Sequence, residues 1–219
     1  KNGNIYSLIG IMDKGFDINN DSKQLLQYSS MNGFYRYFKF VLSILDKDQK
    51  SKYCNQNTYE NICFYYVSFG NASIFKLYLE EFHDRNLESA IYCAIERNYM
   101  NIINTFFEYL LKYKKSNVSP NKILNPSLRK ETDELFIYLL SKLKTIYSKL
   151  VFNNELFMEL LKDTCRLNNL TICNTITDII LSNKPKEDFS PAFKTAASNG
   201  SNEICQYFID KKVFINFNK

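Results

Sequence analysis

The chain has 219 residues, of which 45% are hydrophobic, and it carries a formal charge of +5 at pH 7. Its six Gly and four Pro are few for a β-sandwich or a β-barrel, which place those residues in turns, so the composition favours helices. The apolar stretches are about ten residues long, well short of the roughly 20 that a membrane-spanning helix needs, so we expect no transmembrane segment.

Seven polar turns divide the chain into similar segments. An apolar-periodic stretch follows each turn and also precedes every turn except the first. The two ends of the chain are most alike, because Asn2-Gly3 and Asn199-Gly200 are each followed by an apolar stretch, a polar turn and Ile-Asn. The turns recur on average about every 33 residues, a period typical of helix-turn-helix repeats. In chain order they are centred on Gly3, Gly33, Gly70, Asn98, Glu131, Asn168 and Gly200.

A helix is predicted after each turn. Residues four, five, eight and nine positions beyond a turn lie on one helical face, and only Ser7 and Thr177 among them are not apolar. We therefore expect this face to be buried. The residues are Ser7, Leu8, Ile11, Met12, Tyr37, Phe38, Val41, Leu42, Ile74, Phe75, Tyr78, Leu79, Ile102, Ile103, Phe106, Phe107, Leu135, Phe136, Leu139, Leu140, Ile172, Cys173, Ile176, Thr177, Ile204, Cys205, Phe208 and Ile209.

A shorter helix is predicted before each turn except the first. Residues eight and seven positions before a turn are all apolar, and the residue three positions before it is small or apolar. The former are Leu25, Leu26, Ile62, Cys63, Ala90, Ile91, Ile123, Leu124, Leu160, Leu161, Ala192 and Phe193, and the latter are Ser30, Val67, Ile95, Leu128, Cys165 and Ala197. Because one helix pair cannot bury its apolar face alone, we expect neighbouring pairs to stack.

Residues 190–200 read SPAFKTAASNG and are followed by Glu203-Ile204 and Ile215-Asn216. This arrangement resembles the ankyrin repeat, whose pattern is TPLHxAAxxGHxEIVxxLLxxGADIN. Residues 14–19, KGFDIN, resemble the hairpin at the end of that pattern. The resemblance implies an all-α, ankyrin-type α-solenoid of about seven stacked helix-turn-helix repeats, the first of them truncated.

The pattern predicts a single ankyrin-repeat array over residues 1–219. Because Gly3 lies at a turn between two helices, the first repeat lacks its first helix, and we interpret the chain as a fragment of a longer array. The predicted repeats span approximately residues 1–20, 21–52, 53–84, 85–117, 118–152, 153–186 and 187–219.

Several features depart from the ankyrin pattern. No predicted repeat opens with Thr-Pro-Leu-His, whose side chains hydrogen-bond neighbouring turns in the family, so we expect looser hairpins or loops between repeats. Pro126 falls where the first helix of the fifth repeat should run, and because proline removes a backbone donor we expect a shortened or distorted helix there. The polar segments 47–57 and 114–121 are expected to be long loops.

The cysteines favour a reducing environment. Five of the six, Cys63, Cys93, Cys165, Cys173 and Cys205, lie at predicted core positions, where a reduced thiol packs as a small apolar group. Cys173 and Cys205 occupy the same position in successive repeats, and stacked helices lie roughly 8–10 Å apart, too far for a disulfide. We therefore expect an intracellular, cytoplasmic protein, with the nucleus and a host cell left open as alternatives. The sequence has no Cys-x-x-Cys pair, and we expect neither a metal nor a cofactor.

No group of residues in the sequence predicts catalysis. The one histidine, His83, lies between two predicted helices, and a nucleophilic Cys–His pair would require it to reach a buried and unreactive thiol. The carboxylates fall on predicted outer faces or turns, and the chain has no glycine-rich phosphate loop. We therefore expect a protein that is not an enzyme.

In the ankyrin family, partners contact the hairpin tips and the exposed sides of the first helices on the concave face. The resemblance implies a monomeric scaffold that binds another protein there. The net positive charge, the basic run Lys112-Tyr113-Lys114-Lys115 and the many aromatic residues leave one alternative open, a basic scaffold that binds nucleic acid or an acidic membrane surface. The candidate contact residues directly precede five of the turns: Met31, Asn32, Ser68, Phe69, Glu96, Arg97, Arg166, Leu167, Ser198 and Asn199.

Overall fold

The computed structural model describes residues 5–15, 18–45, 67, 69–81, 87–113, 119–129, 133–147 and 154–216. Within these residues all regular secondary structure is helical. The prediction of an all-α protein is therefore confirmed.

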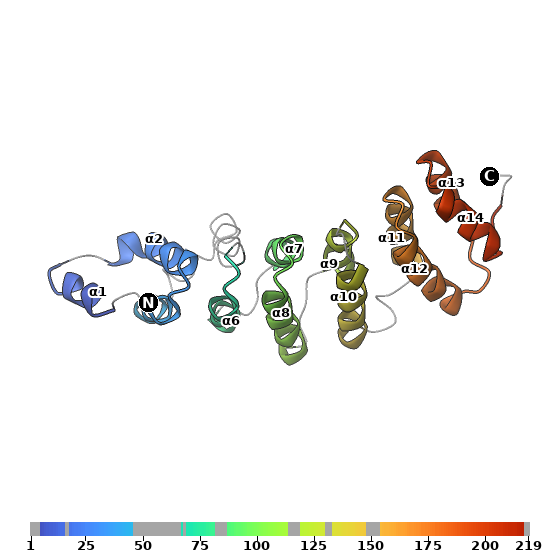
Figure 1. Cartoon of the computed structure of the whole chain (residues 1–219). Helices are drawn as coiled ribbons and strands as arrows, with labels where there is room; N and C mark the ends of the chain where they lie inside the picture. Colours follow the sequence, from blue (N-terminus) through green and yellow to red (C-terminus); the bar gives the residue numbers. More distant parts are fainter. Residues whose placement is uncertain are drawn as a thin grey trace. The chain divides into compact units, whose positions relative to one another are not determined.

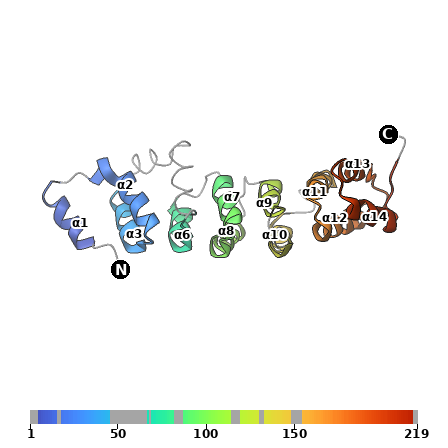
Figure 2. The same cartoon turned by 45° about the horizontal axis from the view of Figure 1, so that its top comes forward.

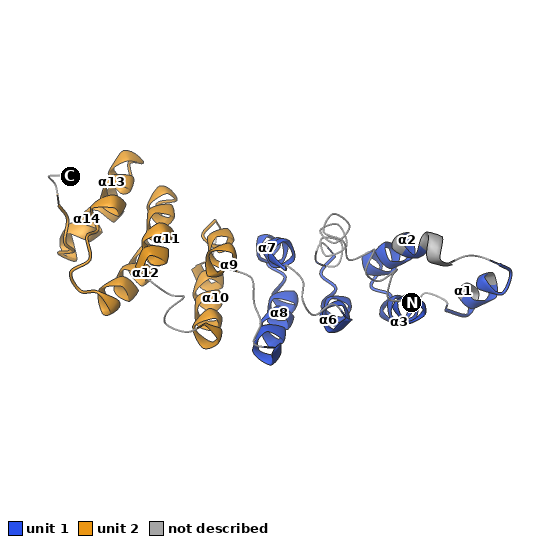
Figure 3. Ribbon diagram, turned by 180° about the vertical axis from the view of Figure 1, so that it is seen from behind, with its two compact units in different colours: residues 1–118 blue, residues 119–219 orange. Residues whose placement is uncertain are grey.

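The chain forms two compact units, residues 1–118 and residues 119–219 (Figure 3). The division falls one residue beyond the boundary predicted between the fourth and fifth helix pairs. Each unit is described by itself.

In the first unit, helices that precede and follow a turn pack against each other, as α2 does with α3 and α7 with α8 (Figure 2). The helices that follow a turn also form their own row, in which α1 contacts α3, α3 contacts α6 and α6 contacts α8. The helices are α1 (Ile5–Met12), α2 (Ile18–Met31), α3 (Tyr35–Ile44), α6 (Ala72–Glu81), α7 (Glu88–Glu96) and α8 (Met100–Tyr113).

The second unit contains two layers of helices. One layer holds α9, α11 and α13, the other holds α10, α12 and α14, and each helix of the first layer packs on its partner in the second (Figures 1 and 2). The helices are α9 (Pro120–Ser127), α10 (Asp133–Ile146), α11 (Asn154–Arg166), α12 (Leu170–Asn183), α13 (Ser190–Ser198) and α14 (Asn202–Asp210).

The predicted turns coincide with residues in the left-handed backbone region. At the end of α2, the N–H of Gly33 donates to the carbonyl of Ser30 at 3.3 Å, and the N–H of Phe34 donates to the carbonyl of Ser29 at 2.8 Å. This pair of bonds ends the helix in a Schellman motif, which requires a positive φ at Gly33. Positive φ values between 53° and 71° occur at Gly33, Gly70, Asn98, Asn168 and Gly200, which confirms these five turns, whereas Gly3 and Glu131 lie outside the described residues.

Most positions that the helical pattern predicts to be buried are buried. In α3, α6, α8, α10 and α12, the residues five and eight positions after the predicted turn are at most 2% exposed. The predicted core positions Ser7, Leu8, Ile11, Ile62 and Cys63 lie outside the residues whose burial is described.

A few predicted core residues are not buried. Met12, Leu25 and Tyr37 are half-buried, and the other exceptions lie in α13 and α14. Ile209 is 52% exposed and Ala197 is also exposed, although both match buried positions elsewhere. The reason is that, among the described helices of their unit, α13 and α14 have neighbours on only one side. The pattern identified the correct face, but a face is buried only where a neighbour covers it.

The helix at Pro126 is short, as predicted, whereas one predicted loop needs correction. Pro126 lies inside the last turn of α9, which has 8 residues, against 9 in α7 and α13, 13 in α11 and 14 in α2. The helix continues one residue beyond the proline, because the bond that proline removes lies in the final turn. Pro120 and Asn121 begin α9 rather than lying in the loop predicted for residues 114–121, and the loop predicted for residues 47–57 lies outside the described residues.

The resemblance at the start of the chain also needs correction. Ile18 and Asn19, which the KGFDIN segment places in a hairpin, are the first residues of α2. The corresponding segment at the other end, residues 213–216, is not helical. It packs back on the start of α13, where the N–H of Phe189 donates to the carbonyl of Phe214 at 2.9 Å.

Lys212 follows α14 in the left-handed conformation, with a φ of 55°. A residue with a Cβ pays roughly 1–2 kcal/mol there relative to glycine, partly offset by the larger entropy of glycine in the unfolded chain. We therefore expect Lys212→Gly to raise the free energy of unfolding by about 0.5–1 kcal/mol, measured by urea denaturation.

Lys212→Ala is the matched control, because it removes the charge and keeps the Cβ. We expect it to change the free energy of unfolding by less than about 0.3 kcal/mol. An equal gain from both variants would show that the charge of Lys212, rather than its backbone conformation, limits stability.

Candidate functional site

Apart from Ser68 and Phe69, the candidate contact residues lie at the carboxyl ends of described helices that precede the turns. We call the two residues before each turn the pre-turn residues. Ser68 lies outside the described residues, and Glu96 is half-buried. The other pre-turn candidates are exposed: Met31, Asn32, Phe69, Arg97, Arg166, Leu167, Ser198 and Asn199. Exposures of 47% for Met31 and 45% for both Phe69 and Leu167 leave large apolar side chains open to solvent.

In the first unit, side chains connect successive turns. The Asn71 side-chain amide donates to the carbonyl of Ser30, and its Oδ1 lies 3.0 Å from where a Cβ on Gly33 would stand. The Tyr99 ring lies 3.6 Å from the equivalent Cβ position on Gly70. Each turn is therefore packed on the turn before it, which brings the pre-turn residues of neighbouring helix pairs side by side.

Arg97 belongs to this packed arrangement. A hydrogen bond with the Tyr99 side chain raises the pKa of the Arg97 guanidinium above its ordinary value. The guanidinium is therefore a fixed positive charge on the turn next to Phe69. An aromatic ring and an arginine on neighbouring turns are residue types enriched in protein interfaces.

The second unit repeats the connection between turns. The Ser201 hydroxyl donates to the carbonyl of Cys165 at 2.7 Å, and this bond is buried. Ser201 follows its turn directly, as Asn71 does, and Cys165 and Ser30 each lie three residues before the preceding turn. Side-chain bonds to the preceding turn thus occur at equivalent positions in both units, in a chain without the Thr-Pro-Leu-His opening.

Asn169 makes a variant of this connection. Its Nδ2 donates to Asp133 Oδ1 at 2.6 Å, and its Oδ1 accepts from the N–H of Ile172 at 3.0 Å. Asn169 therefore caps α12 and also joins α12 to the start of α10.

A groove opens between the carboxyl ends of α9 and α11. Its volume is about 150 Å³, and it is lined by Asn125, Leu128, Arg129, Asp163, Arg166 and Leu167. Arg166 Nη1 contacts Asp163 Oδ1. The candidates Arg166 and Leu167 therefore lie in a hollow, together with residues that the sequence analysis did not select.

Arg129 lines the same groove, although it was not among the predicted candidate contact residues. It lies two positions before the predicted turn at Glu131, as Arg166 lies two positions before Asn168. The register of the turns was sufficient to select it.

Some pre-turn side chains are occupied by their own helix. The Nδ2 atoms of Asn32 and Asn199 donate to the carbonyls of Tyr28 and Thr195, each at 2.8 Å. The Ser198 hydroxyl also donates to the carbonyl of Thr195, at 3.0 Å. These three side chains close the ends of α2 and α13, so they are weaker candidates for partner contact than Phe69, Arg97, Arg166 and Leu167.

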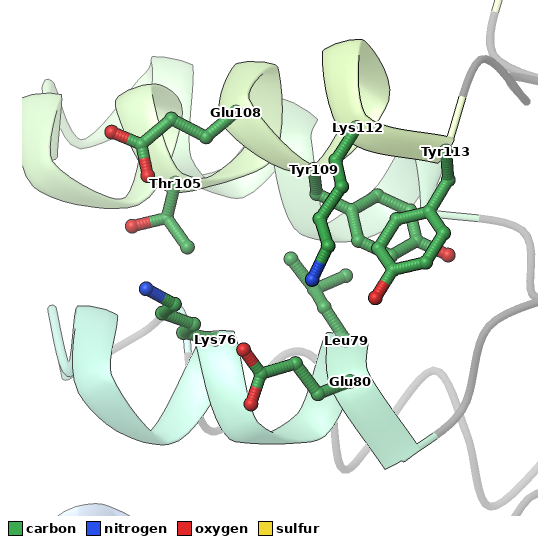
Figure 4. A pocket seen from close by; sticks show the side chains of 8 residues that line it. All are labelled: Lys76, Leu79, Glu80, Thr105, Glu108, Tyr109, Lys112 and Tyr113. Carbon is green, nitrogen blue, oxygen red and sulfur yellow. The ribbon is translucent and has the colours of Figure 1, made fainter.

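Two other hollows lie between helices that follow turns. One, of about 140 Å³, separates α6 from α8 and has Lys76, Glu80, Glu108 and Lys112 around it (Figure 4). Its charges alternate in sign, and Lys112 Nζ lies 5.0 Å from the centroid of the Tyr113 ring. Such a mixed-charge surface is typical of solvated helices rather than of a site for one ligand.

The other hollow, of about 630 Å³, lies between α10 and α12 beside Phe157. Asp178 at its edge is paired with Lys211, whose Nζ lies 2.8 Å from Asp178 Oδ1. This pair joins α12 to the end of α14 and gives the carboxylate a structural partner.

The described cysteines do not form a reactive group. Cys93, Cys165, Cys173 and Cys205 are free thiols. A hydrogen bond with the Cys173 thiol and burial both raise the pKa of the Cys165 thiol. A raised pKa leaves little thiolate, which is the nucleophilic form. His83, Cys54 and Cys63 lie outside the described residues.

Within the described part of the chain, no group of three or more His, Cys, Asp or Glu side chains is placed to hold a metal ion. The same part contains no helix with the length and apolar character needed to cross a bilayer.

No protein-family model matches the chain, and neither a curated protein nor a solved structure shows significant similarity to it. The resemblance to ankyrin repeats therefore rests on the residues and turns of the chain itself.

Proposed function

We propose that the chain is an ankyrin-type repeat array that binds another protein through its pre-turn residues. The observation that carries this proposal is the regular packing of successive turns. Within the first unit Asn71 bonds to the turn before it, and within the second unit Ser201 does so from the equivalent position. Each unit therefore presents exposed pre-turn residues on packed turns, as repeat proteins that bind partners do.

Four exposed side chains make the row suitable for protein binding. Phe69 and Leu167 offer apolar surface, and Arg97 and Arg166 offer planar groups with several donors. Partner contact would bury the apolar surface and pair the guanidinium groups. The proposed role is that of a scaffold that carries out no reaction.

The test is an affinity capture from lysate of the native host, at low and high salt, with Phe69→Ala/Arg97→Ala in parallel. We expect protein partners that resist salt to be captured by the unmodified chain and to fall at least tenfold with the double variant, because truncation of hot-spot residues typically costs more than 1 kcal/mol each.

Lys76→Ala/Leu111→Ala is the matched control. It also removes one cation and one apolar side chain, and Leu111 is 50% exposed on α8, about 20 Å along that helix from the turn at Asn98. Partners lost equally with both double variants would contradict the proposed surface. Nucleic acid or lipid that salt releases, with the Phe69/Arg97 variant behaving as the unmodified chain does, would instead support a basic scaffold for polyanions.

A further inference from the structure

We infer that the groove between α9 and α11 binds an acidic segment of the partner protein, in which a carboxylate side chain lies beside an apolar one. The inference rests on the proposed function and specifies which chemical groups of the partner protein the surface binds. The carboxylate would bind between Arg129 and Arg166, and the apolar side chain would cover Leu167.

The side chains that line the groove carry more positive than negative charge. Two guanidinium groups and one carboxylate, Asp163, line the same hollow of about 150 Å³. Asp163 is bound to Nη1 of Arg166, whose side chain is 56% exposed. Arg129 is exposed and has no ion-pair partner among the residues that the structure describes. One positive charge therefore stays uncompensated in the groove.

The surroundings of the groove add to this charge. Lys162 lies in the carboxyl-terminal half of α11, toward the end at which the groove lies. The acidic residues Glu155 and Glu159 lie nearer the amino end of α11, and Glu159 accepts a hydrogen bond from Asn121 at 3.2 Å. An anionic partner is therefore attracted to the turn end of these helices.

The groove also has an apolar part, formed by Leu128 and Leu167. Leu128 is 4% exposed, whereas Leu167 at the edge is 45% exposed. An arginine at a helix end needs only the helix dipole to explain it, but the dipole does not explain an exposed leucine beside two arginines. A partner that pairs the guanidinium groups and covers the leucine satisfies both features.

The same features favour a peptide carboxylate over a nucleic acid. A phosphate chain brings several charges close together, and Asp163 within the groove repels them. Leu167 offers no donor or acceptor to a sugar or a base edge. A single carboxylate can instead form a two-point pair with a guanidinium and leave Asp163 in place.

Selection of random twelve-residue peptides displayed on phage, using the intact 219-residue chain as bait, tests the inference. We expect the selected peptides to be enriched in Asp or Glu next to Leu, Ile or Phe. A synthetic copy of the most frequent peptide is then titrated by fluorescence anisotropy. We expect Arg129→Gln/Arg166→Gln to weaken its binding at least tenfold, because charge-assisted bonds to the carboxylate are lost.

The control variant Lys186→Gln/Lys212→Gln removes two exposed charges outside the groove and is expected to change the affinity less than about twofold, since distant surface charges are screened. Asp163→Asn should tighten binding about two- to fivefold, because it removes the carboxylate that competes for Arg166. A purely structural role of Arg166 predicts no such gain.

Four results would overturn the inference: no selected peptides, selected peptides without carboxylates, equal weakening by both double variants, or stronger dependence on the two arginines for a labelled (dT)20 oligonucleotide than for the peptide. These failures are distinct from failure of the proposed function. If capture of host partners still depended on Phe69 and Arg97, the proposed scaffold function would stand, and only the binding of an acidic segment in the groove would be rejected.

Discussion

Replacement of Phe208 by Ala is expected to lower the free energy of unfolding by about 3–5 kcal/mol. Phe208 is fully buried in α14, and its ring centroid lies 5.9 Å from that of Phe189 and 5.7 Å from that of Tyr207. Truncation removes the packing of the ring and leaves a cavity that the surrounding helices fill only in part. Urea denaturation followed by far-ultraviolet circular dichroism measures the loss.

The next residue along α14 supplies the control. Ile209 is 52% exposed, so Ile209→Ala removes little buried surface and is expected to change the free energy of unfolding by less than about 0.5 kcal/mol. The comparison is informative because the helical pattern predicts that both residues are buried, whereas only Phe208 is buried in the structure. Similar losses from both variants would mean that a neighbour covers Ile209 and that the outer face of α14 is buried.

The turns were predictable because their cause is local. A residue that ends a helix in the left-handed conformation needs to be Gly or Asn in most cases, and the chain has these at Gly33, Gly70, Asn98, Asn168 and Gly200. The buried face was predictable for a similar reason, because helical periodicity specifies which residues share a side. The start of α9 follows a local rule as well, because Pro120 suits the first turn of a helix. The polar residues around it nevertheless led to the prediction of a loop there.

The contacts between helix pairs were much less predictable. Nothing in the sequence near Ser201 indicates that its hydroxyl reaches the carbonyl of Cys165, which lies 36 residues earlier. The exposure of Ile209 depends in the same way on the absence of a packed neighbour on that side of its unit. Periodicity identifies a face, whereas its coverage depends on contacts between segments that are distant along the chain.

The candidate site was predicted in part. The pre-turn register selected Phe69, Arg97, Arg166 and Leu167, which are exposed. It did not reveal that the side chain of Asn32 bonds to its own helix, because serine and asparagine can bond either the backbone or a partner. The groove at Arg129 was missed because a pattern assigns positions one at a time, while a groove depends on two helix ends lying together.

Ser201→Ala is expected to lower the free energy of unfolding by about 1–3 kcal/mol, because it removes a buried hydrogen bond between successive turns. Ser201 is 1% exposed, and its hydroxyl makes no capping bond within α14, so the bond to Cys165 is the interaction that the substitution removes. Ser198→Ala is the control, since the Ser198 hydroxyl bonds within α13 at an exposed position and its loss should cost less than about 0.5 kcal/mol. If Ser201→Ala were no more destabilising than Ser198→Ala, the bonds between turns would not stabilise the stack, and the rigid row of pre-turn residues would lose its physical basis.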